Sequence, residues 1–192
     1  MAVTYALVRI FSLKKKNRDM AQQSRLIEIA NIELQARFGM DKIINDTLVD
    51  RALIIKVHNG GSKLFVGVSK YISIIEEAHS SKILPVISDF QKFPIDREYM
   101  EMIRRLLEDS IYVVNVSTMK ESTLKRVYIK DGLKSSILYP LIGSELGFYF
   151  VSFSSTSNDF EVLDSSEFST IEIELNKIKL LYKKAADLKL LH

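Results

Sequence analysis

The 192-residue sequence contains no cysteine, no tryptophan and only three prolines. Without cysteine there can be no disulfide, thiolate metal site or cysteine nucleophile, which excludes a disulfide-stapled secreted domain. The charge excess is also small, because 27 lysines and arginines face 24 aspartates and glutamates. A net charge of +3 gives no specific signal for nucleic-acid binding. The composition, 47% hydrophobic and 27% charged, predicts a globular cytoplasmic protein with one full domain.

Long hydrophobic runs are lacking too. Residues 2–13 are mostly apolar, but Arg9 interrupts a run that is already too short to cross a hydrocarbon core of about 30 Å. A basic cluster follows it, formed by Lys14, Lys15, Lys16 and Arg18. We predict that residues 1–18 are an amphipathic arm that docks on a partner subunit or on the domain itself, which covers residues 19–192. The alternative is a helix that lies on an anionic membrane surface.

The stretch His58-Asn59-Gly60-Gly61 joins two apolar runs. A phosphate-binding loop would require a helix after the glycines, whereas residues 63–70 are β-branched and aromatic. Asn-Gly and Gly-Gly pairs favour a hairpin turn, because these residues tolerate positive φ. We therefore predict a hairpin of strands 51–58 and 63–70, with His58 hydrogen-bonded to the backbone at the turn.

Helices and strands alternate along the rest of the chain. Helices are expected at 19–48, 97–109, 121–130 and 165–188, and strands at 110–117, 133–142 and 148–155. Gly39 is expected to stop or kink the first helix, and Pro140 to mark an edge or bulge. Residues 71–95 are the least regular stretch, beginning with a short helix at "YISIIEEAHSS". The order predicts an α+β fold with a central antiparallel sheet, flanking helices and a long helix at each end.

The last helix carries an apolar seam with 3–4 spacing. Its members are Phe168, Ile171, Leu175, Ile178 and Tyr182. Such a seam suits helix–helix packing. It fits a second copy of the chain, and it also fits the N-terminal helix of the same chain. We expect a homodimer, because long helices at both ends of the chain can bundle with copies of themselves.

The sequence resembles a GAF-type domain, a small-molecule sensor fold related to PAS, over roughly residues 20–188. The residues that carry the resemblance are Gly132, Pro140-Leu141, Gly147, Phe160 and Asp164. They stand where the family has a helix-ending glycine, a strand closing on Pro-Leu, a glycine before an aromatic strand, and a Phe and an acid before the last helix. A second similarity is to small stand-alone GAF-like bacteriophage proteins of unassigned role.

The resemblance implies a ligand pocket on one face of the sheet, roofed by the irregular middle segment. The resemblance does not identify a cofactor. Bilin attachment through cysteine and methionine-sulfoxide reduction are excluded, because the chain has no cysteine. The chain also lacks the residues with which family members usually bind cyclic nucleotides. Ser165 replaces the expected glutamate, and no Asn-Lys pair precedes Phe160.

No catalytic or metal-binding constellation is found, so we expect no enzyme. No two of the three histidines have the spacing of a helical metal site, and the paired carboxylates lie in helical contexts near lysine or arginine. A ligand site could combine aromatic rings, hydroxyls and a cation. The candidates are His58, Tyr71, Arg104, Tyr128, Tyr139 and Tyr149.

Two functions therefore compete. The first is a non-enzymatic GAF-like sensor that binds a small molecule and acts through dimerisation or a partner protein. The second is a structural or interaction subunit of a larger assembly, viral assemblies included, that uses the fold as a scaffold. In the second, the N-terminal arm docks on a partner or a membrane surface.

Overall fold

The computed structural model describes the backbone of residues 2–60, 70–144, 147–156, 160, 165–188 and 190–191. Within these ranges, side chains are described from residue 18 onward, except that of residue 144. Residues 63–69 of the predicted strand at 63–70, and Asp164 before the last helix, lie outside the described residues.

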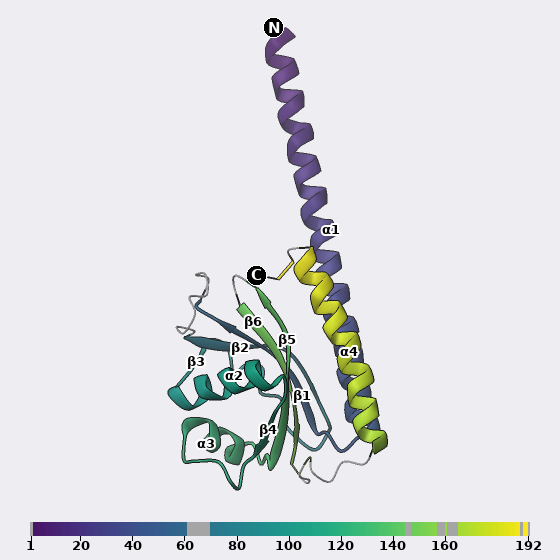
Figure 1. Ribbon diagram of the computed structural model, residues 1–192. Coiled ribbons are helices and arrows are strands. Elements are labelled where there is room, and N and C mark those ends of the chain that lie inside the picture. The colour runs from purple at the N-terminus through teal and green to yellow at the C-terminus, as the bar shows by residue number, and fades with distance from the viewer. Residues whose placement is uncertain are drawn as a thin grey trace.

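Within the described residues, six antiparallel strands form one sheet in the order β3-β2-β1-β6-β5-β4. The strands are β1 (Arg51–His58), β2 (Tyr71–His79), β3 (Phe93–Pro94), β4 (Tyr112–Asn115), β5 (Ser135–Ser144) and β6 (Gly147–Ser155). The helices are α1 (Ala2–Asp46), α2 (Arg97–Asp109), α3 (Thr123–Lys130) and α4 (Ser165–Asp187). Helices α1 and α4 lie on one face of the sheet, and α2 and α3 lie on the other (Figure 1). The predicted α+β fold with long terminal helices is confirmed.

The two short helices begin at caps that the sequence encodes locally. Asp96 accepts a hydrogen bond from the backbone N–H of Tyr99 at 2.9 Å, and Ser122 accepts one from Lys125 at 3.1 Å. Each bond satisfies an N–H that has no partner inside the helix. After α3 the chain turns at Gly132, whose φ of +69° suits glycine. The predicted helix at 97–109 is confirmed, whereas the second begins at Thr123, after its cap, and not at the predicted residue 121.

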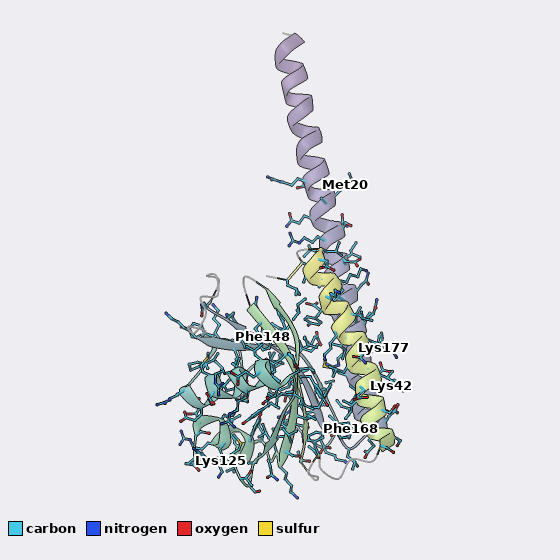
Figure 2. All side chains as sticks on the ribbon, viewed as in Figure 1. Met20, Lys42, Lys125, Phe148, Phe168 and Lys177 are labelled. Carbon is cyan, nitrogen blue, oxygen red and sulfur yellow. The ribbon has the colours of Figure 1, made fainter. Side chains whose placement is uncertain are left out.

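The first core fills the space between the sheet and the α1–α4 pair (Figure 2). Tyr139, Tyr149 and Phe153 project into it from the strands, and Ile178 does so from α4. Gly39 does not end α1, contrary to the prediction. A Cβ on Gly39 would lie 3.4 Å from Ile178 Cγ1, which is van der Waals contact, so this position faces α4 within a continuous helix.

The prediction for residues 71–95 was wrong in its first part. The expected short helix is strand β2, which pairs with β1 from Arg51↔His79 to His58↔Tyr71. Its alternation is broken by a bulge, because Ile75 is an extra residue between the partners of two consecutive residues of β1. This break and the adjacent Glu-Glu pair at 76–77 give the sequence a helix-like appearance. The structure thus makes β2 the outer neighbour of β1.

A second bulge lies in β5, where the register with β6 shifts between Pro140 and Ile142. Proline lacks the N–H that a regular ladder needs, so a bulge accommodates it. The predicted edge or bulge position of Pro140 is confirmed.

Helix α1 is continuous from Ala2 to Asp46, and its N-terminal part extends well beyond the domain (Figure 1). The predicted arm and the helix after it are therefore one helix. No helix within the described residues is both long enough and apolar enough to span a membrane.

Candidate ligand-binding site

The second face of the sheet, under α2 and α3, is closely filled by apolar and aromatic side chains. Phe150 is completely buried there, and Tyr99 from α2 and Tyr128 from α3 belong to the same apolar cluster. A small cavity of about 40 Å³ remains between α3 and the sheet. This volume holds a few water molecules but no metabolite. Burial raises the pKa of Tyr128 to about 12, although a hydrogen bond with Ser136 opposes the shift.

A buried ionic cluster lies at one end of this small cavity. Arg51 and Glu77 are each 3% exposed, and Arg51 Nε lies 3.4 Å from Glu77 Oε1. Arg51 also reaches Asp131 Oδ2 at 3.2 Å and donates to the backbone oxygen of Leu84 at 2.9 Å. Glu77 accepts hydrogen bonds of 2.8–3.0 Å from the backbone N–H groups of residues 86–87. The cluster therefore ties the segment after β2 to β1 and to the end of α3.

Three buried serines lie on the same face. Ser136 Oγ is 2.7 Å from Ser152 Oγ and 3.1 Å from Ser154 Oγ. Sequence reasoning could not decide whether these serines face a cavity or the outside. They face inward, and the hydroxyls satisfy one another because strand pairing brings them together.

A larger groove of about 520 Å³ lies between α2 and the edge strand β4. Its apolar lining includes Met102, Tyr112, Val114 and Met119, and Leu124 lies between it and the small cavity, lining both. Ligand pockets commonly measure 300–1,000 Å³. Of these two pockets between described residues, the groove has the volume for a metabolite.

The rim of the groove carries both signs of charge. Hydrogen bonds from Arg104, and then from Arg105, lower the pKa of Glu101 to about 2. Within the described part of the chain, no ion-pair partner is found for Arg97 or Lys120. These two cations remain for an anionic group on a ligand.

The structure does not bring the six predicted ligand residues together. Tyr128 lines the small cavity, whereas Tyr139 and Tyr149 lie on the opposite face, under α4. Arg104 is exposed on α2 and is held by Glu101 and Glu108. His58 and Tyr71 meet at one end of the β1–β2 pair, with ring centroids 6.1 Å apart.

The seam of α4 is buried inside the chain. Ile171 and Ile178 are completely buried against α1 and the sheet, and Leu175 and Tyr182 nearly so. This is the second arrangement that the sequence allowed, in which the N-terminal helix of the same chain fills the groove. The side chains of Lys14, Lys15 and Lys16 are outside the described set, and Arg18 is exposed on the projecting part of α1.

Sequence reasoning missed Arg51, Glu77, Met102, Met119 and Lys120. One signal was present for Arg51: it shares the alternating positions of Leu53 and Ile55, which face the apolar core under α2 and α3. A charged residue on that face has to find a buried partner. No group of three His, Cys, Asp or Glu side chains suited to a metal occurs in the described residues.

His58 is held neutral by its surroundings. The backbone N–H of Gly60 donates to Nδ1 at 3.0 Å, so the proton is on Nε2, which donates to Ser73 Oγ at 2.9 Å. The predicted hydrogen bond at the turn is therefore observed. Burial lowers the pKa of His58, and the charges of Lys56 and Lys92 lower it further.

The free energy of unfolding should therefore fall as the pH drops through about 6.5. Near this pH His58 takes up a proton in the unfolded state but stays neutral in the folded state. Denaturant titrations at a series of pH values between about 8 and about 5 measure this slope. The variant His58→Gln should flatten it. Equal slopes for the wild type and His58→Gln would contradict the assignment.

No family model matches the chain. Solved structures do match it. The red-light-absorbing state of a red/green cyanobacteriochrome shares 14% identity over 82% of this chain and 97% of that chain, with a TM-score of 0.58. The photoproduct state of a GAF3 domain from Synechocystis shares 15% over the same fractions, also at 0.58. A GAF domain/HD domain protein from Geobacter sulfurreducens shares 9% over 80% and 92%, at 0.56.

The chain has a GAF fold. Identities this low establish the fold and not the ligand, and the similarity to bacteriophage proteins stays a prediction. The structure explains two of the residues that carry the family resemblance. A Cβ on Gly147 would lie 2.8 Å from Lys56 Cε and 3.0 Å from the backbone oxygen of Val57, and Phe160 is buried in the first core.

Proposed function

We propose that this protein is a non-enzymatic GAF-type sensor module that binds a small molecule in the groove between α2 and β4. The observation that carries the proposal is the volume of that groove, about 520 Å³, on the face of the sheet that α2 and α3 cover. A far-red cyanobacteriochrome photoreceptor and the chromophore-binding domain of a bacteriophytochrome share the fold, which supports a sensory role. The signal leaves through α1 and α4, to a second copy or to a partner protein.

The lining indicates the chemistry of the ligand. Met102, Met119 and Tyr112 favour an apolar body, because flexible thioethers and aromatic rings adapt to apolar shapes. Arg97 and Lys120 favour one anionic group at the rim. A covalently attached bilin is excluded by the absence of cysteine, and the small cavity of about 40 Å³ has no room for a tetrapyrrole.

Native mass spectrometry of gently purified protein tests the proposal. A co-purifying small molecule, lost on denaturation and present once per chain, would support the sensor and identify its ligand. A chain that carries no such molecule and also fails to bind a probe in the groove would overturn it.

The anionic dye 8-anilinonaphthalene-1-sulfonate is a suitable probe, because it combines an apolar body with a sulfonate. We expect saturable binding that weakens about tenfold in the double variant Arg97→Glu/Lys120→Glu, a loss of about 1.4 kcal/mol. The matched control Lys130→Glu/Lys134→Glu reverses two exposed charges outside the groove lining. Equal weakening in both variants would show that the dye responds to net charge and not to the groove. Fluorescence titration measures both dissociation constants.

The second candidate is a scaffold subunit of a larger assembly. The close filling of the α2–α3 face by Tyr99, Tyr128 and Phe150 favours it, because a sensor commonly keeps an open pocket there. A chain without ligand that co-assembles stoichiometrically with another protein would establish the scaffold in place of the sensor.

A further inference from the structure

Helix α1 has two apolar faces, and the domain covers only one of them. The covered face contains Ile32, Ala36, Met40 and Ile43, each at most 5% exposed. On the opposite face, four large apolar side chains are each more than half exposed. They are Met20 (53%), Ile27 (56%), Leu34 (52%) and Phe38 (63%).

The projecting part of α1 also lacks support from the domain. Every described residue from 18 to 24 is exposed, and this part of the helix extends beyond α4 and the sheet (Figure 1). In proteins, most of the stability of a helix comes from tertiary packing of an apolar face. The projecting part therefore requires a second surface to pack against.

The spacing of the exposed residues identifies that surface. Met20, Ile27 and Leu34 are seven residues apart, and Phe38 follows four residues later, which are the d and a positions of a heptad repeat. The repeat continues toward the N-terminus of the helix. Its d positions are Ala6, Leu13, Met20, Ile27 and Leu34, and its a positions are Val3, Ile10, Asn17, Ser24, Asn31 and Phe38.

We propose that the outer face of α1 pairs with the same face of a second copy of this chain, as a parallel, in-register, two-stranded coiled coil over residues 3–38. The d positions supply apolar layers throughout. Asparagine at a meets its own counterpart only in the parallel, in-register arrangement, where the two amides hydrogen-bond across the axis. Asn17 and Asn31 thus specify orientation and strand number at some expense in stability.

The basic cluster near the N-terminus of α1 predicts how salt affects the dimer. Parallel pairing brings the two copies of the basic cluster, Lys14–Lys16 and Arg18, to the same level of the coil. Their repulsion is screened by salt, so added salt should strengthen the dimer. Antiparallel pairing would separate the clusters and remove this effect. The pairing is independent of ligand binding in the groove, so either proposal can fail alone.

Light scattering during gel filtration, over a concentration series, measures the mass of the wild type and of charged variants. We expect the mass of two chains for the wild type and of one chain for Ile27→Glu/Leu34→Glu. The matched control Leu26→Glu places the same charge on a side chain that is 59% exposed but lies outside the a and d positions, and it should stay dimeric. Circular dichroism checks that each variant keeps its helices.

A wild-type mass of one chain would overturn the proposal, and co-sedimentation of that monomer with anionic vesicles would assign the outer face to a membrane surface. Loss of the dimer in Leu26→Glu as well would also overturn it.

Orientation is read from disulfides, because the chain has no cysteine of its own. Met20→Cys, at d, should form a disulfide between identical residues on mild oxidation, whereas Gln22→Cys, on the outside of the coil, should not. A dimer in which Met20→Cys fails to cross-link would refute the parallel arrangement.

Discussion

Replacing Arg51 with alanine should lower the free energy of unfolding by about 3–5 kcal/mol, because removal of one partner leaves a buried charge uncompensated. Glu77 is 3% exposed, and its carboxylate would lose the cation 3.4 Å away. Leu84 would lose a hydrogen bond of 2.9 Å to its backbone oxygen. Urea denaturation followed by circular dichroism measures the change.

The double variant Arg51→Met/Glu77→Gln provides the matched control. It removes both charges and keeps most of the side-chain volume, and the amide oxygen introduced at position 77 can still accept a hydrogen bond from residues 86–87. We expect it to be clearly more stable than Arg51→Ala, because the charge of Glu77, which is 3% exposed, is removed together with its partner, while Asp131 is 14% exposed and keeps some contact with solvent. If the two variants are equally unstable, packing rather than charge explains the loss.

The second large effect is expected at Phe150. This side chain is completely buried under α2 and α3, and truncation to alanine should cost about 3–5 kcal/mol through lost burial and a new cavity. Phe148 stands two residues earlier on the same strand and face, with its ring centroid 6.0 Å from that of Phe150. Because Phe148 is only partly buried, Phe148→Ala should cost clearly less. Equal losses would contradict the central position of Phe150 in this core, and thermal unfolding compares the two variants.

Much of the fold could be predicted because its signals are local. The N-cap at Asp96, the positive φ of Gly132 and the bulge at Pro140 each depend on a few neighbouring residues. The same is true of strands β5 and β6, which are rich in aromatic and β-branched residues. Strand β2 was missed because Ile75 interrupts its alternation, and only pairing with β1 shows that the segment is extended.

Little of the candidate site could be predicted. Arg51 and Asp131 are 80 residues apart in the chain, and no local pattern couples them. The groove combines α2, β4 and the segment between β4 and α3, so its shape depends on how a helix lies against a sheet edge. Tyr139 and Tyr149 were predicted to contact a ligand, but they lie on the face that α4 covers, which no local pattern reveals.

By itself, the sequence determined where the four long helical segments and most strands lie, that thiol chemistry is excluded, and that residues 3–38 carry a seven-residue apolar repeat. Periodicity, capping and composition are properties of neighbouring residues, so they can be read without a fold. Only the tertiary structure decided which apolar stripe of α1 faces the sheet, because Ile32 and Leu34 are equally apolar and burial against α4 distinguishes them. It also decided which face of the sheet is filled and which edge leaves a groove, since both follow from the packing of elements distant in the chain.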